Sequence, residues 1–153
     1  MAAGTYILDL FDEVKQLIGP LNVLLVEEGL NELSEINDQF VKAGVRQRPY
    51  MLINLTQRKI SRVACQDQEF DVEENVPILL ETYVRGDQRD AILYEGIIKR
   101  WFKGQESFLR SRITDAALVV IHPETSSLTV DKEHTNSDGW LVSAQFTVKF
   151  NWS

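Results

Sequence analysis

The end of the chain carries its strongest pattern. From Trp140 to Trp152 apolar and polar side chains alternate, with Leu141 as the exception. Side chains of a strand point alternately to its two faces, so the pattern predicts one β-strand with an apolar and a polar face. At about 3.3 Å per residue this strand would run about 43 Å, whereas most strands have about 5–6 residues. A strand of this length favours a structural subunit organised by its sheet. Its apolar face would carry Trp140, Val142, Ala144, Phe146, Val148, Phe150 and Trp152.

Two other segments have helical periodicity. Residues 5–18 place apolar side chains along one face of a helix that Thr5 can cap, although the sequence lacks a full capping box. A second helix is predicted after Gly86, with Asp87 as its N-cap and Gly104 as its C-terminal stop. The face of the second helix that we expect in the core carries Tyr94, Ile97, Ile98, Trp101 and Phe102.

The segments around these helices allow alternatives. Gly19-Pro20 is predicted to end the first helix. Residues 21–30 fit either a further helix, which we favour, or a short strand. Residues 31–39 fit a loop or a short helical turn, and residues 105–112 a loop or a short helix.

Four further strands are predicted. Three lie between the two helices, and the fourth lies between the second helix and the terminal strand. Together they give an α+β fold, with a mainly antiparallel four- to five-stranded sheet and helices packed on one face, in a single domain covering residues 1–153. Pro123 is expected to end the last of the four. The predicted strands are Tyr50–Thr56, Lys59–Gln66, Val76–Arg85 and Ala116–His122, and the loops are an acidic turn at 67–75 and a long, polar, mobile loop at Glu124–Asp138.

Composition sets limits on the class of protein. The 153 residues suit one domain, and 44% hydrophobic residues is typical of a globular chain. There is no apolar run of about 18 residues that would cross a membrane, and the N-terminus lacks the features of a secretory signal. Cys65 is the single cysteine, so an internal disulfide is excluded and a reducing compartment is expected.

Charge is unevenly distributed along the chain. The net charge of −7 argues against a protein that coats nucleic acid, since such proteins need a basic surface. Residues 45–63 contain five bases and no acid, whereas residues 64–82 contain six acids and no base. One interpretation is a solvated surface. The other is a ring subunit whose basic patch meets an acidic patch of its neighbour. The charged residues of this predicted hairpin are the basic Arg58, Lys59 and Arg62 and the acidic Asp67, Glu69, Asp71, Glu73 and Glu74.

No motif of catalysis or cofactor binding is present in the sequence. His122 and His134 have no cysteine pair near them, so a zinc site is not expected. The acids from Asp67 onward resemble a calcium loop in spacing, but Val72 and Ile78 occupy the positions that need glycine and an acid. There is no glycine-rich phosphate loop and no nucleophile elbow. We therefore expect no catalytic residues, no cofactor, no metal and no enzymatic activity.

The order of these elements resembles that of the tail terminator, or tail completion, proteins of long-tailed bacteriophages, and is similar to the lambda tail terminator family. The resemblance covers about residues 5–152 and is one of pattern, with few identical residues. The matching features are the amphipathic N-terminal helix, the strand Pro49–Thr56, the acidic hairpin Asp67–Glu74, the strand Ile78–Val84, the Asp87-led helix with Trp101, and the aromatic strand Asp138–Phe150.

The resemblance implies a function. Such proteins form a ring, usually a homo-hexamer, that caps the tail tube, stops its polymerisation and offers a docking surface to the head connector. The expected partners are further copies of the chain, the tail tube protein and a head-completion or connector protein. Genomic DNA would pass through the lumen without specific binding, and no membrane is involved. The protein would reside in the tail or neck of the virion, and in the host cytoplasm during assembly.

The predicted hairpin, Arg58 to Glu74, is the site where we expect the subunit or tube contacts, because it carries opposite charges. The loop Glu124–Asp138 is a second candidate contact. The alternatives are another neck subunit, such as a head–tail stopper or adaptor, and a small enzyme or binding domain.

Overall fold

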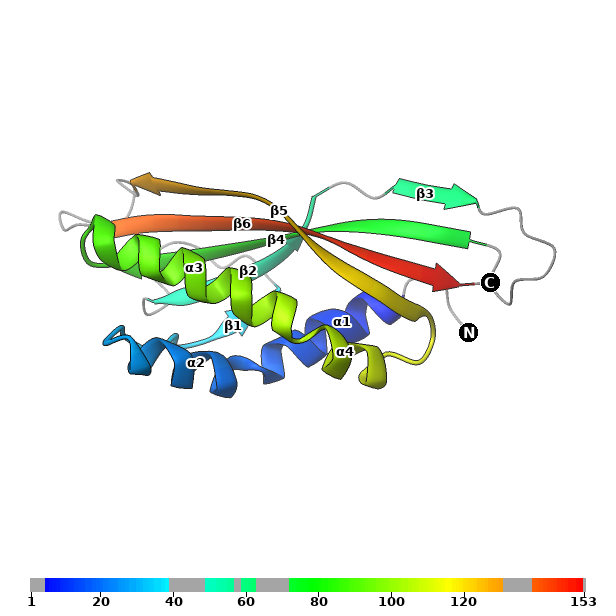
Figure 1. Cartoon of the computed structure of the whole chain (residues 1–153), viewed down its shortest axis with the longest axis horizontal. Coiled ribbons are helices and arrows are strands. Elements are labelled where there is room, and N and C mark those ends of the chain that lie inside the picture. Colours follow the sequence, from blue (N-terminus) through cyan, green and yellow to red (C-terminus); the bar gives the residue numbers. More distant parts are fainter. Residues whose placement is uncertain (1–4, 39–48, 57–58, 63–71, 131–138, 153) are drawn as a thin grey trace.

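A computed structural model describes residues 5–38, 49–56, 59–62, 72–130 and 139–152, with the side chains of 59–62 excepted. Within these residues the chain forms helices on one side of a twisted sheet (Figure 1). The fold class is therefore α+β, as predicted. The helices are α1 (Thr5–Gln16), α2 (Ile18–Glu27), α3 (Gln88–Gly104) and α4 (Glu106–Arg112). The strands are β1 (Ile36–Asn37), β2 (Tyr50–Leu55), β3 (Lys59–Arg62), β4 (Val72–Arg85), β5 (Ala117–Val130) and β6 (Gly139–Trp152).

The sheet has the strand order β1-β2-β4-β6-β5, and β3 pairs with β4 beyond the end of β2. The β1–β2 pair is parallel, and the other pairs are antiparallel. The two-residue strand β1 was not predicted, since residues 31–39 were expected to form a loop or a helical turn. Two residues give no periodicity from which a strand could be recognised.

The strands β4 and β6 form the centre of the sheet. They pair along their whole length, from Val72 opposite Trp152 to Arg85 opposite Gly139. Burial alternates along both strands, so the predicted apolar face of the terminal strand is confirmed. Leu141, the exception to the alternation, lies on the other face opposite Tyr83, whose ring stacks on Tyr50. That face therefore has an apolar patch of its own at this point.

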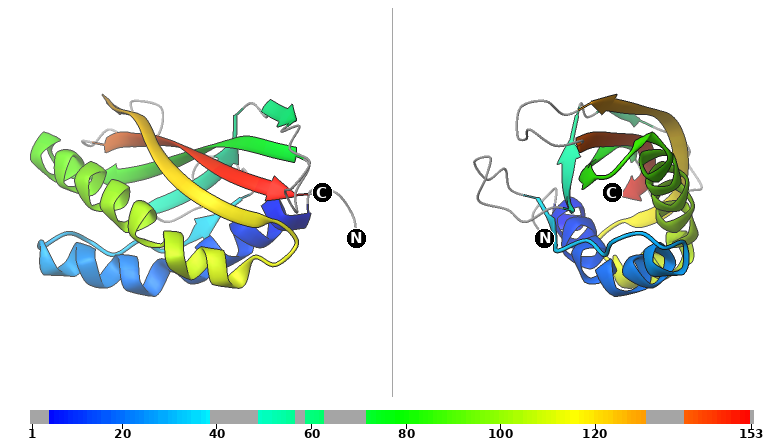
Figure 2. Two further views of the ribbon diagram at one scale, coloured as in Figure 1. Left: turned by 45° about the vertical axis from the view of Figure 1, so that its right-hand side comes forward. Right: turned by 90° about the vertical axis from the view of Figure 1, so that its left-hand side faces the viewer.

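The helices cover the apolar face of the sheet. In the end-on view of Figure 2 the sheet curls over them. The predicted face of α3 is buried, and the ring of Phe102 lies 4.6 Å from that of Phe146 on β6. At the other end of β6, the rings of Tyr6 and Phe150 are 4.9 Å apart. Most buried apolar residues of the described helices and strands belong to one core cluster, and Tyr50 and Leu52 of β2 lie outside it.

The N-cap of α3 follows the sequence prediction, since the side chain of Asp87 accepts a hydrogen bond from the Asp90 N–H at 3.0 Å. The helix ends at Gly104 as predicted, but its C-cap is Gln105. Gly86, directly before this cap, has φ of +116°. A glycine is favoured here because other residues rarely adopt a positive φ.

The prediction for Gly19-Pro20 was wrong. The first helix already ends at Gln16, and Gly19 and Pro20 lie in the first turn of α2, which starts at Ile18. A proline is tolerated in the first helical turn, where its missing N–H costs no intrahelical hydrogen bond. The favoured alternative for residues 21–30, a further helix, is confirmed up to Glu27. The helical alternative for residues 105–112 is confirmed as α4.

Two strand boundaries differ from the predictions. The strand β4 starts at Val72, so residues 72–75 of the predicted acidic turn are in the sheet. The strand β5 does not stop before Pro123 but continues to Val130, so the first half of the predicted mobile loop is also in the sheet. Proline is tolerated on an edge strand, and the pairing with β6 shifts register between Pro123 and Ser126. Residues 131–138 lie outside the described part of the chain.

Candidate assembly surfaces

The predicted contact hairpin is described in part. The backbone of β3 pairs with the start of β4, with Lys59 opposite Asn75 and Arg62 opposite Val72. The described part of the chain does not include the side chains of β3. It also does not include the predicted site residues Arg58, Asp67, Glu69 and Asp71. The interface role of these residues stays a prediction.

The two acids of the hairpin that the structure describes point to opposite faces of β4. Glu73 forms an ion pair with Lys149 of β6, with 3.0 Å between Oε1 and Nζ. Glu74 is fully buried, and its Oε1 accepts hydrogen bonds from the hydroxyl of Tyr6 and from Nε1 of Trp152. Glu74 therefore connects α1, β4 and β6 inside the subunit. The sequence did not indicate this, because the prediction placed Glu74 in a solvated turn.

The helix α2 presents an apolar surface that the sequence analysis missed. Only Leu21 and Leu25 of this helix are buried, while Val23 and Val26 are 59% and 53% exposed. A helix that is apolar all round is normally covered on all sides. The signal was available in the sequence as the run Leu21-Asn-Val-Leu-Leu-Val26, in which apolar side chains occupy every face of the helix.

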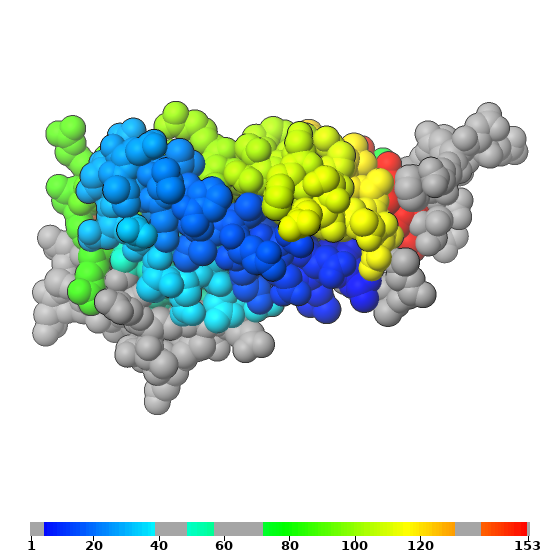
Figure 3. Space-filling view, turned by 90° about the horizontal axis from the view of Figure 1, so that it is seen from below, coloured from blue at the N-terminus to red at the C-terminus, as the bar shows by residue number. Residues whose placement is uncertain are grey.

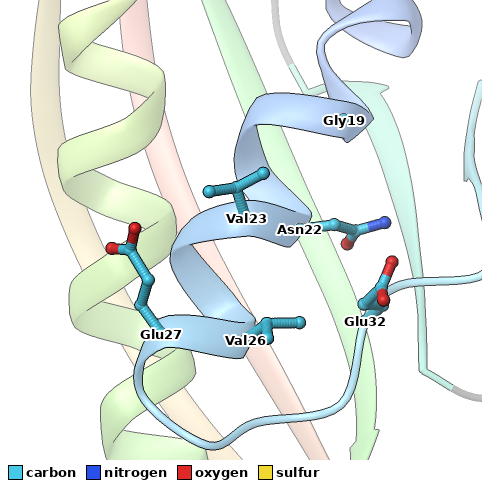
Figure 4. A pocket seen from close by; sticks show the side chains of 6 residues that line it. All are labelled: Gly19, Asn22, Val23, Val26, Glu27 and Glu32. Atoms are coloured by element: carbon cyan, nitrogen blue, oxygen red, sulfur yellow. The ribbon is translucent and has the colours of Figure 1, made fainter.

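The exposed valines line an open hollow of about 380 Å³ (Figure 4). Asn22 lies in its lining and joins α2 to the segment that carries Glu32. Its side chain donates to the Leu33 carbonyl at 3.1 Å and accepts from the Leu33 N–H at 2.8 Å. The hollow is therefore held in shape by hydrogen bonds. Its complete lining is Gly19, Asn22, Val23, Val26, Glu27 and Glu32.

Acidic residues surround this hollow. Glu27 and Glu32 lie in its lining, and Glu28 follows α2 directly. No lysine or arginine occurs between Lys15 and Lys42. A smaller hollow of about 150 Å³ lies between α2 and α3, where Leu24 and Arg100 are among its lining residues. The α2 surface thus combines apolar side chains with negative charge.

The helix α4 carries the opposite charge. Phe108 is 40% exposed, and the guanidinium of Arg112 lies over its ring, 5.4 Å from the ring centre. Arg112 also approaches Glu13 of α1, at 3.5 Å between Nε and Oε2. Residues 99–112 hold five bases and one acid. An exposed aromatic ring with a basic surround therefore lies on the same side of the sheet as the acidic hollow.

The single acid of this segment, Glu106, organises the α4 region. Its carboxylate accepts from the Ile121 N–H at 2.8 Å and from Lys103 at 2.7 Å, and it also pairs with Arg110. The hydrogen bond from Ile121 and the contact with Lys103 lower the pKa of Glu106 from 4.5 to about 2. Glu106 is thus ionised throughout the range in which the protein would function.

Side chains of α3 and α4 also donate hydrogen bonds to backbone carbonyls of β5. Lys103 donates to the Ile121 carbonyl at 2.7 Å. Arg110 donates to the carbonyls of Leu118 and Val119 at 2.9 and 2.6 Å. As β5 is the last strand of the sheet, these contacts satisfy backbone groups that would otherwise be exposed at its edge.

In the described part of the chain, no three histidine, cysteine or acidic side chains are grouped so that they could hold a metal ion. None of the helices described here has the length and apolar character needed to cross a membrane.

No protein-family model matches the chain, and no curated protein matches its sequence. A solved structure described as "Virion of native gene transfer agent (GTA) particle" contains a chain that matches with a TM-score of 0.47 and 7% identity, over 84% of each chain. A likeness at this level carries no functional argument.

Proposed function

We propose that the chain is a structural subunit of a phage virion: a tail terminator that forms a ring on the end of the tail tube. The ring would stop polymerisation of the tube and offer a docking surface to the head connector. What carries this proposal is the order of elements on which the resemblance was based. An amphipathic first helix, a strand after Pro49, a long central strand, an Asp87-capped helix with Trp101 and an aromatic last strand all occur in the structure.

The architecture suits such a role physically. The core is filled by the ribbon of β4 and β6 and by the helices on it, so the subunit is built as a stiff block. A ring of identical copies needs two unlike surfaces on each copy, and α2 and α4 differ in both shape and charge. An acidic subunit also suits a conduit for DNA, because like charge keeps phosphate from adhering to it.

Electron microscopy of tails tests the proposal. Tails assembled in the absence of this protein should have tubes of excess length, and adding back the wild-type protein should restore the normal length. Tubes of normal length that lack only heads would contradict termination and support a head–tail stopper or adaptor.

Binding to purified partners gives a second test. The protein should be retained by immobilised tail tube protein in its assembled form, with bovine serum albumin as a control for nonspecific retention. Retention by the connector protein and not by the tube would contradict the terminator role.

A further inference from the structure

We propose that the hollow on α2 receives Phe108 of a second copy of this chain. The proposal deepens the one above, since it names the surfaces through which copies of the subunit would meet. Both surfaces expose apolar side chains to solvent. Val23, Val26 and Phe108 expose 59%, 53% and 40% of their surface, and burying them against each other would be favourable.

The shapes of the two surfaces are complementary. The α2 surface is concave, with a volume of about 380 Å³ and two valines in its lining. The α4 surface instead presents a single aromatic ring. Large aromatic side chains that fill an apolar pocket are the usual centres of protein interfaces. Two hydrogen bonds between Asn22 and Leu33 hold the segment that carries Glu32 beside α2, so the lining of the hollow is ordered before binding.

The charges are complementary as well. Glu27 and Glu32 belong to the hollow, whereas Arg112 covers Phe108. When the ring enters the hollow, the guanidinium travels with it and reaches the rim of acids. Opposite charges around a small apolar contact fix the orientation of two partners and exclude contacts between like surfaces.

The location of the two surfaces determines that the contact is between copies arranged head to tail. Figure 3 views the helical side, where α2 and α4 lie toward opposite ends, and Figure 1 shows the same separation from the side. Each copy would offer its hollow to one neighbour and its Phe108 to the other. Contacts between unlike surfaces of this kind produce rings when the rotation closes. The chain thus carries both halves of the interface, so a second copy is the occupant to which we commit.

Site-directed cross-linking tests the contact. Val26→Cys and Phe108→Cys are each introduced into the full-length Cys65→Ser chain, and the two proteins are mixed with a short bismaleimide. We expect a cross-linked dimer in the mixture and no dimer from either protein alone. Phe108→Cys removes the ring itself, so Ser111→Cys, in the next turn of α4, serves as a second partner that keeps Phe108.

A matched control uses Leu93→Cys on α3, which is 40% exposed like Phe108 but belongs to neither surface. Val26→Cys should not cross-link to it. The proposal is overturned if Val26→Cys reacts with Leu93→Cys as readily as with the α4 cysteines, if it cross-links to itself, or if it reaches neither α4 cysteine at any concentration. Circular dichroism of each variant shows that it is folded.

Charge reversal tests the orientation. Glu27→Lys with Glu32→Lys in the Val26→Cys protein should abolish the cross-link to Ser111→Cys. Adding Arg112→Glu to the Ser111→Cys protein should restore it, because the charges are then exchanged between the two surfaces. Failure of the exchange to restore the cross-link would contradict the contact. If the charge-reversed variants no longer cross-link but still limit the length of tails, the interface is refuted and the proposed function stands.

Discussion

The hydroxyl of Tyr6 donates a hydrogen bond to the carboxylate of Glu74, a residue 68 positions further along the chain. Nε1 of Trp152 donates to the same oxygen at 3.1 Å. The first helix, the start of β4 and the end of β6 therefore meet at one buried carboxylate. A polar group that is removed from water must be satisfied by such contacts, so this cluster fixes how the N-terminal helix lies on the sheet.

Tyr6→Phe should lower the free energy of unfolding by about 1–3 kcal/mol, because a buried acceptor loses one of its donors. Urea denaturation provides the measurement. In a double-mutant cycle with Glu74→Gln, the loss in the double variant should be smaller than the sum of the two single losses. Additive losses would show that the two side chains are not coupled.

Stability should depend on Glu106 between pH 5 and 2. The folded-state pKa of about 2 lies below the ordinary value of 4.5. The carboxylate therefore stabilises the fold above pH 4.5, and this contribution is lost as the pH falls from 4.5 toward 2. Glu106→Gln should be less stable than the wild type at pH 7, and the difference should shrink as the pH falls through this range.

Thermal denaturation across this pH range measures the effect, with the exposed Glu124→Gln as the control. A difference between wild type and Glu106→Gln that is unchanged from pH 7 to pH 2 would refute the role of this carboxylate.

Phe146→Ala should destabilise the protein by about 3–5 kcal/mol, as expected for a large cavity in a core. Phe146 is fully buried and packs against Phe102. Phe108→Ala is the matched variant at the surface, where the same atoms are removed from a partly exposed ring, and it should cost less than about 1 kcal/mol. Equal losses in guanidinium denaturation would contradict the assignment of the two rings to core and surface.

Gly86→Ala should destabilise α3 by more than 1 kcal/mol, on the order expected where the native φ is positive. Gly86 has φ of +116°, and a Cβ at this position would collide with the carboxylate of Asp90. Gly104→Ala is the control, because a Cβ there meets no atom within 4 Å. If both variants unfold at the same temperature, the positive φ at Gly86 does not require a glycine.

Reversing the charge of Arg58 and Arg62 to glutamate should weaken assembly, if the predicted hairpin lies at a subunit or tube contact as its opposite charges suggest. Light scattering of the assembled protein gives the mass of the ring. An unchanged mass would remove the basic half of the hairpin from the proposed interface.

Periodicity over many residues predicted the larger elements. The boundaries of β6 and the N-cap of α3 were predictable because thirteen alternating positions, and a cap followed by a helical stripe, leave few alternatives. Proline was misleading at Pro20 and Pro123, since its effect depends on whether the position lies in a first helical turn or on a sheet edge. The sequence alone does not reveal which of these locations a proline occupies, because both depend on the tertiary structure.

The candidate surfaces were less predictable for a physical reason. The charges of the hairpin predicted a contact surface, but charge alone does not distinguish a solvated acid from a buried one such as Glu74. The apolar surface of α2 could have been found from its sequence, because five of six consecutive residues from Leu21 to Val26 are apolar. The pairing of that surface with Phe108 required knowledge of which residues the fold leaves uncovered.

The contacts that Lys103, Glu106 and Arg110 make with β5 protect part of one edge of the sheet. An exposed edge strand can pair with a strand of another molecule, and repeated pairing of this kind produces fibres. From Leu118 to Ile121 the side chains of α3 and α4 occupy the places that an incoming strand would need, and Pro123 offers no N–H to one. In the proposed role as a virion component, the protein would accumulate at high concentration before assembly, and this protected part of the sheet edge would limit strand addition between copies.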